Sequence, residues 1–191
     1  NTRGIDCEII NHDKSEHKEK IAAENNQETF GNLSSLLKCF EVAKKDQSDL
    51  IYFVEDDYLH YEHSLVDMLN TYERVSSQHK DEIIVCPSDY PFNYMNNEKT
   101  NILIGSQQHW RTITKMLCTF MISKKMFQKH INNFEKTCER RHEPFEKYLN
   151  KILESEIGIS PIKSLAIHMT NVNSSYGLSP FIDIKKLWEE N

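Results

Sequence analysis

Apolar residues recur in the chain with a helical spacing. From Asn32, a typical N-cap residue, the apolar positions follow the i, i+3, i+4, i+7 pattern of one helical face. This predicts a helix that ends near 44–46, where cations suit the last turn. Its inward residues are Leu33, Leu36, Leu37 and Phe40. A second helix is predicted from Ser64 with Leu65, Leu69 and Tyr72 on its inner stripe, and others from Lys124, from Glu143 and over 183–189.

Continuous apolar runs, rich in β-branched and aromatic residues, indicate buried strands. The clearest run is Leu50 to Val54, which ends in three acids. Another run covers Ile83 to Cys86 and is stopped by Pro87, because proline cannot donate a ladder hydrogen bond. Further strands are expected at Ile5–Ile10, at Ile102–Ile104, within 112–123 and at Ile162–Ile167.

Strands that alternate with helices predict an α/β fold, with a layered, mixed but mostly parallel sheet flanked by helices. We expect one domain over 1–191, with 172–191 as its C-terminal tail, because no repeat or linker interrupts the pattern. In such sheets, ligands bind outside the carboxyl ends of the strands. Glu55–Asp57 and His168 each stand at such an end. The long loop 87–101 is a further candidate for function.

Composition narrows the functional classes. The 191 residues suffice for one domain with a sizeable core, and 38% hydrophobic and 27% charged residues are ordinary for a soluble protein. A net charge of −6 argues against a nucleic-acid binder with a broad basic surface. No apolar run approaches the ~18 residues that suggest a membrane span, and the first residues lack an apolar signal core.

The cysteines give little indication of a metal site or of disulfides. Five cysteines stand at 7, 39, 86, 118 and 138, an odd number without a Cys-x-x-Cys pair. This spacing argues against zinc ribbons and dense disulfide frameworks. Cys39, Cys86 and Cys118 lie within apolar patterns and are expected to fill the core. The pattern favours a reducing compartment, so we expect a cytoplasmic protein.

The triplet Glu55-Asp56-Asp57 is the strongest candidate for chemistry. Three adjacent carboxylates repel one another and are costly to desolvate without a cation or hydrogen-bond donors. A hard divalent ion, Mg²⁺ or Mn²⁺, held together with substrate phosphates, would compensate them. The alternative is a solvated acidic turn after a strand. The surrounding chain must decide between these two interpretations.

The order of features resembles a nucleotide-sugar-dependent glycosyltransferase of the GT-A type, which carries a DxD-like motif after an apolar strand. The resemblance runs from about Ile5 to Asn171. Asn32 resembles the start of the helix that precedes the motif in that family. The stretch Leu117–Phe127 resembles the acceptor-side strand and helix, and Ala166-Ile167-His168 resembles a late histidine of the metal site. The motif itself reads Phe53-Val54-Glu55-Asp56-Asp57.

The resemblance implies a GT-A-like, Rossmann-like catalytic domain that uses Mn²⁺ or Mg²⁺ and a nucleotide-sugar donor. Asp57 would be a direct metal ligand, and His168 would complete the metal site. Glu55 and Asp56 would contact the ribose, the sugar or a water on the metal. The acceptor would be a glycan or another molecule with a hydroxyl group, and the sugar would be transferred to it with inversion.

Inversion needs a group that takes the proton of the acceptor hydroxyl. Glu143 is the first candidate, because it stands where many members of the family have an acidic pair, and Asp89 is the second. The neighbour of Glu143 is Pro144 rather than a second acid, which departs from that pair. Arg111 and Lys115 are candidates to bind the diphosphate, since both side chains bind phosphate.

A second departure concerns the nucleotide. The first strand and helix of the family's plan are not visible, and 5–15 look more like its second strand. The chain also starts without Met, so we interpret it as N-terminally truncated. The alternatives are a non-catalytic glycan- or protein-binding module and, as a third option, a nucleotidyltransferase or phosphohydrolase that uses the same acids on a phosphate.

Overall fold

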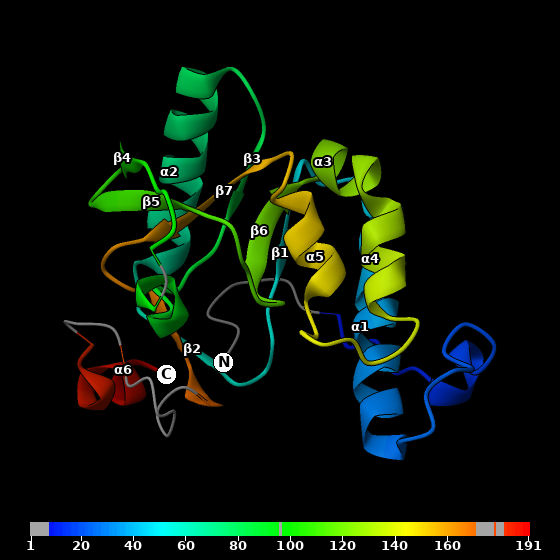
Figure 1. Ribbon diagram of the computed structural model, residues 1–191. Helices are drawn as coiled ribbons and strands as arrows, with labels where there is room; N and C mark the ends of the chain where they lie inside the picture. Colours follow the sequence, from blue (N-terminus) through cyan, green and yellow to red (C-terminus); the bar gives the residue numbers. More distant parts are fainter. Residues whose placement is uncertain (1–7, 96, 171–177, 179–181) are drawn as a thin grey trace.

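A six-stranded mixed sheet lies between two layers of helices in this α/β chain (Figure 1). The computed structural model describes residues 8–95, 97–170, 178 and 182–191. A separate two-stranded sheet, β2 with β8, adjoins it. The strands are β1 (Leu50–Phe53), β2 (Tyr58–His60), β3 (Ile83–Val85), β4 (Ile102–Ile104), β5 (His109–Ile113), β6 (Phe120–Ser123), β7 (Ile157–Pro161) and β8 (Ala166–His168). The α-helices are α1 (Gln27–Lys45), α2 (Ser64–His79), α3 (Lys124–Lys129), α4 (Ile131–Thr137), α5 (Lys147–Ile152) and α6 (Ile184–Glu190), and the 3₁₀ helices are η1 (Lys14–His17) and η2 (Pro91–Tyr94).

The prediction of a mostly parallel sheet is wrong. The strand order is β1-β6-β3-β7-β5-β4, and among the described strands only β3 and β7 pair in parallel. Strands β1 and β3, which α2 connects, do run in the same direction. However, β6 lies between them and is antiparallel to both. The strand–helix–strand pattern therefore predicted the common direction of β1 and β3, but it did not predict that β6 lies between them.

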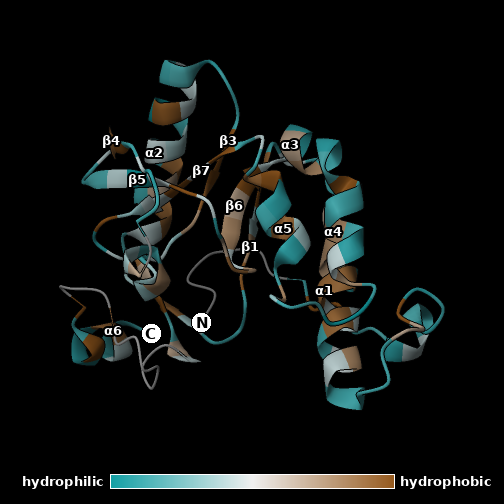
Figure 2. Cartoon of the chain, in the orientation of Figure 1, coloured by the Kyte–Doolittle hydropathy of each residue, from teal (hydrophilic) through white to brown (hydrophobic). Residues whose placement is uncertain are grey.

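The alternating side chains of the strands separate two hydrophobic cores. In β3, Ile84 faces a core shared with α1, α3, α4 and α5, whereas Ile83 and Val85 face a core shared with α2. Figure 2 shows the hydrophobic colouring concentrated in the strands and hydrophilic residues on the outer helix surfaces. The first core holds a cluster of rings from α1, β1, β6, α3 and α4: Phe40, Phe53, Phe120, Phe127 and Phe134.

Several predicted boundaries and faces need correction. Helix α1 begins at Gln27 rather than near Asn32, because the side chain of Asn26 caps it by accepting from the Thr29 N–H. Helix α2 begins at Ser64 as predicted, but it buries a different stripe. Leu65 and Leu69 are exposed, and the buried residues are Ser64, Asp67, Met68, Thr71 and Val75. Because this buried face includes polar side chains, the pattern of apolar residues did not reveal it.

The end of the chain also differs from the expectation. The strand predicted over 162–167 is replaced by β7, which ends at Pro161, and β8, which begins at Ala166. The helix predicted from Glu143 begins at Lys147. Of the predicted strand at Ile5–Ile10, residues 5–7 lie outside the described residues, and 8–10 form no strand. Of the predicted tail from 172, residues 172–177 and 179–181 lie outside the described residues, and the described part contains α6 close to the predicted helix over 183–189. None of the described helices is long and apolar enough to cross a membrane.

The ring cluster gives a stability prediction. Phe40 is 1% exposed, and its ring centroid lies 5.2 Å from that of Phe53 and 5.1 Å from that of Phe134. We expect Phe40→Ala to lower the free energy of unfolding by ~3–5 kcal/mol, because it removes buried contacts and leaves a cavity. Urea denaturation measures this loss. Val42→Ala on the same helix is the control, since Val42 is exposed and should change stability by less than ~1 kcal/mol. A similar small effect for Phe40→Ala would contradict the packing described.

Candidate functional site

The acidic triplet leaves the sheet at the carboxyl end of β1, where it meets the start of β6. The backbone N–H of Glu55 donates to Thr119 Oγ1 at 3.0 Å, and the Thr119 hydroxyl donates to Glu55 Oε2 at 3.3 Å. Thr119 is fully buried and directly precedes β6, whose first residue, Phe120, is the register partner of Phe53. The strand register therefore holds Glu55 against the start of β6.

The environment of Glu55 favours a protonated carboxyl group. Burial, together with the charges of Asp57, Glu146 and Asp56, raises the pKa of Glu55 to about 7, although the Thr119 hydrogen bond lowers it. A carboxyl group in such surroundings ionises more readily when a cation or a hydrogen-bond donor of a ligand lies next to it. Asp56, in contrast, is exposed.

Asp57 and His168 are brought together by the small sheet. The register of β2 and β8 pairs Tyr58 with His168, and the backbone N–H of Met169 donates to the Asp57 carbonyl at 2.9 Å. As a result, His168 Nε2 lies 2.8 Å from Asp57 Oδ2. The hydroxyl of Thr170 donates to the same oxygen at 3.2 Å. Two residues far apart in the sequence thus share one site.

Aromatic rings continue from this pair into the loop after β3. The His168 ring stacks on Tyr58, with centroids 4.8 Å apart and an interplanar angle of 10°. The hydroxyl of Tyr58 lies 2.8 Å from that of Tyr90, and both tyrosines are buried. Nδ1 of His168 is buried and has no hydrogen-bond partner among the described residues. The ring is held by stacking and by its contact with Asp57.

This pair suits a divalent ion that also binds substrate. No group of three or more His, Cys, Asp or Glu side chains in the described part of the chain is arranged to hold a metal ion. However, Mg²⁺ in nucleotide sites is bound by only one or two protein ligands together with substrate phosphates. In this structure Asp57 Oδ2 and His168 Nε2 lie 2.8 Å apart, which is a hydrogen-bond distance, and with an ion bound both atoms would turn their lone pairs to it instead. A carboxylate and an imidazole also suit Mn²⁺.

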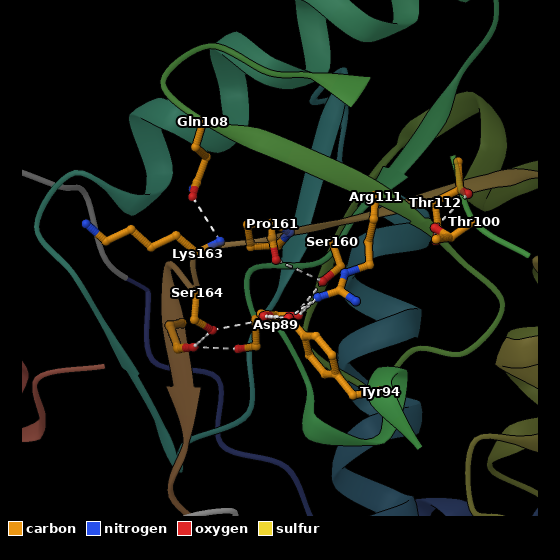
Figure 3. Close-up of polar contacts among 12 residues, drawn as sticks. Asp89, Tyr94, Thr100, Gln108, Arg111, Thr112, Ser160, Pro161, Lys163 and Ser164 are labelled. Atoms are coloured by element: carbon orange, nitrogen blue, oxygen red, sulfur yellow. Dashed lines mark hydrogen bonds and ion pairs between the residues drawn. The ribbon is translucent and has the colours of Figure 1, made fainter. Parts of the chain in front are cut away.

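Asp89 and Arg111 form an ion pair. Arg111 Nη2 lies 2.5 Å from Asp89 Oδ1, and Tyr94 donates its hydroxyl to Asp89 Oδ2 (Figure 3). The backbone N–H of Asp89 donates to Ser164 Oγ at 2.8 Å. The Asp89 side chain is fully buried and that of Arg111 is 10% exposed. Asp89 and Arg111 therefore form a buried ion pair with each other.

The cations predicted to bind the diphosphate are engaged elsewhere. Arg111 contacts Asp89 and also donates to the Tyr94 hydroxyl. Lys115 Nζ lies 3.2 Å from Glu98 Oε1. The structure therefore does not bring either cation to the triplet. A diphosphate bound there would depend on the metal ion for neutralisation.

Glu143 and Glu146 lie in different surroundings. Glu143 is 82% exposed, and its carboxylate pairs with Arg141 at 3.3 Å. Glu146 caps the start of α5, one helical turn before Asn150, whose Oδ1 accepts from the Met116 N–H at 2.8 Å. Because positions i and i+4 share a helix face, Glu146 lies on the side that faces the segment leading into β6.

Electrostatics support the same position for Glu146. Burial raises the pKa of Glu146. Besides burial, the Glu146 charge contributes to the raised pKa values of both Glu55 and Cys118. Glu143 was predicted in place of Glu146, because Glu143 stands at the position where the family has its acidic pair. The spacing of three between Glu143 and Glu146 was the available signal. Thr119 was missed as well, since no local pattern links it to Glu55.

Comparison with known proteins adds no assignment. No family model matches the chain, and no curated protein gives a significant match. The functional argument therefore rests on the geometry of the site.

The pKa of Glu55 predicts how stability depends on pH in metal-free protein. Its ordinary value is 4.5 and its folded value is about 7, so between these values the folded state holds more protons than the unfolded state. The free energy of unfolding contributed by Glu55 therefore falls as pH rises through this window, by ~1–3 kcal/mol for a partly buried group. Urea denaturation in EDTA from pH 4.5 to 8 measures the slope.

The matched variants for this titration are Glu55→Gln and Glu154→Gln. Glu55→Gln should flatten the pH dependence, because the side chain no longer titrates. Glu154→Gln alters an exposed carboxylate and should leave the wild-type slope. Equal slopes in wild type and Glu55→Gln would show that burial does not perturb Glu55.

Proposed function

We propose that the chain is a metal-dependent glycosyltransferase that moves a sugar from a nucleoside diphosphate donor to a hydroxyl acceptor with inversion. The observation that carries the proposal is the contact of Asp57 Oδ2 with His168 Nε2 at the carboxyl end of β1, beside a partly buried Glu55. Carboxylate, imidazole and an acidic flank without a free cation suit a diphosphate that arrives with its own metal ion. A GT-A-like fold is part of this proposal.

The roles of the residues follow from their positions. Asp57 and His168 would hold Mn²⁺ or Mg²⁺, which supplies positive charge for the departing diphosphate. His168 must be neutral to act as a ligand, and its stacking on Tyr58 fixes the direction of Nε2. Glu55, oriented by Thr119, and the exposed Asp56 would accept hydrogen bonds from ribose or sugar hydroxyls.

Glu146 is the better placed acceptor of the hydroxyl proton. In the displacement, the acceptor oxygen forms a bond to the anomeric carbon, and the bond from that carbon to the diphosphate oxygen breaks with its electron pair. The proton of the acceptor passes to a carboxylate. A base works best when its pKa is raised toward the working pH, which burial achieves for Glu146. Glu143 is exposed and paired with Arg141, and Asp89 is bonded to Arg111.

A non-catalytic glycan- or protein-binding module is the second candidate. It is favoured by the engagement of Arg111 and Lys115 in other ion pairs, which leaves the diphosphate without a basic side chain from this pair. A nucleotidyltransferase or phosphohydrolase would use the same acids at phosphorus. Assays of UDP-, GDP- and CMP-sugars with Mn²⁺ separate the three. Transfer or release of the sugar together with the intact nucleoside phosphate supports the first, cleavage at phosphorus to a sugar phosphate or inorganic phosphate the third, and glycan binding without turnover the second.

Asp57→Asn tests the metal site. We expect the variant to bind Mn²⁺ together with UDP or GDP at least ~10-fold more weakly than wild type, because a direct ligand is lost. Titration calorimetry measures the affinity, and circular dichroism checks the fold. Asp46→Asn is the control, since it makes the same change at the exposed C-cap of α1. Unchanged affinity in Asp57→Asn would refute the assignment.

Glu146→Gln and Glu143→Gln compare the two candidate bases directly. We expect Glu146→Gln to lower kcat by ~10²–10⁴-fold, because the acceptor proton then has no base, while the affinity for Mn²⁺ and nucleotide stays within about twofold. Glu143→Gln should cost far less, since its carboxylate faces solvent. The reverse order of losses would return the role of base to Glu143.

A further inference from the structure

An exposed aromatic ring stands on the loop after β3. Among the described residues, Tyr94 and Trp188 are the two aromatic side chains with a large exposed fraction, 54% and 67%. Tyr94 ends η2, and Met95 beside it is also exposed. An exposed tyrosine on a loop is ordinarily free to change rotamer, so the contacts that hold this one are informative.

Three contacts fix the Tyr94 ring. Its hydroxyl donates to Asp89 Oδ2 and accepts from Arg111 Nη2. The guanidinium carbon of Arg111 lies 4.2 Å from the ring centroid, so one face of the ring is covered by a cation. Figure 3 shows Tyr94 and Arg111 converging on Asp89. The exposed surface of Tyr94 therefore belongs to the remaining face and edge, held in one orientation.

This arrangement is a poor way to gain stability. A buried ion pair is weak evidence for stabilisation, because desolvation of both charges offsets their attraction. The pair of Asp89 and Arg111 instead holds an apolar ring in water, which costs both hydrophobic free energy and side-chain entropy. A fixed, exposed aromatic ring does reduce the entropic cost of binding a ligand.

Neighbouring residues of the loop that carries Tyr94 connect this loop with the proposed donor site. Phe92 of η2 stacks on Tyr90 with centroids 5.1 Å apart and an angle of 10°. Tyr90 contacts Tyr58, which stacks on His168. Asp89 and His168 also line one small cavity. Tyr94, through Asp89, and the metal pair, through His168, therefore border the same small cavity.

We infer that Tyr94 is the stacking platform of the acceptor subsite, and that the acceptor is a pyranoside whose apolar ring face lies on Tyr94. A pyranose has one face of C–H groups and a rim of hydroxyls, which suits an aromatic ring flanked by polar groups. The donor sugar belongs at Asp57 and His168, so a sugar on Tyr94 is a second one. The inference rests on the proposed function for the term acceptor.

Saturation-transfer difference NMR with methyl pyranosides of glucose, galactose, mannose and N-acetylglucosamine tests the platform. With wild type, C–H protons of one ring face of at least one pyranoside should receive saturation. Tyr94→Ala and Tyr94→Leu should both lose this signal, since leucine keeps apolar volume but has no planar ring. Trp188→Ala, which removes the other exposed aromatic ring, should retain it. In transfer assays, Tyr94→Ala should raise the acceptor KM by about tenfold or more.

The outcomes separate this inference from the proposed function. Loss of pyranoside saturation in both Tyr94 variants, with unchanged binding of Mn²⁺ and UDP or GDP, supports the platform. Wild-type saturation in Tyr94→Leu would overturn it, because a general apolar patch for protein or lipid would then suffice. Absence of any saturated pyranoside with wild type would also overturn it. An effect of Asp57→Asn on nucleotide binding decides the proposed function independently of these results.

Discussion

The candidate site depends on the antiparallel pairing of β6 with both β1 and β3. Because β6 lies between these strands, its first residues meet the carboxyl end of β1, and Thr119 bonds both the backbone and the side chain of Glu55. The segment before β6 also contacts α5, because the Met116 N–H donates to Asn150 Oδ1, and Glu146 stands at the start of that helix. The position of β6 thus relates carboxylates from two parts of the chain, the triplet and the start of α5.

The gathered acids define the electrostatic character of the site. Burial raises the pKa values of Glu55 and Glu146, so both side chains hold a proton more readily than an exposed glutamate does. The two basic residues predicted to bind the diphosphate are already in ion pairs, Arg111 with Asp89 and Lys115 with Glu98. Ligands must then compensate the charge of these acids. In the function that we propose, a divalent ion and a hydroxyl-rich substrate do so.

Parts of the fold and site were readable from the sequence because their signals are local. The apolar run from Leu50 fixed a strand and placed the triplet at its end, and the acids themselves suggested a cation. The inner face of α2 was misread, because Asp67 and Thr71 are buried by hydrogen bonds to each other and to 106–108, and no hydrophobic pattern reports them. Likewise, the partner of Arg111 was Asp89, which lies on another strand's loop.

The sequence by itself determined the α/β class, the strand that ends in Glu55, Asp56 and Asp57, and the apolar faces of most helices, since hydrophobic periodicity acts between near neighbours. The tertiary structure decided the sheet order, the contact of Asp57 with His168, and the difference between the half-buried Glu146 and the exposed Glu143. These depend on which distant segments pack together, and that choice is made by the whole core at once rather than by any local pattern.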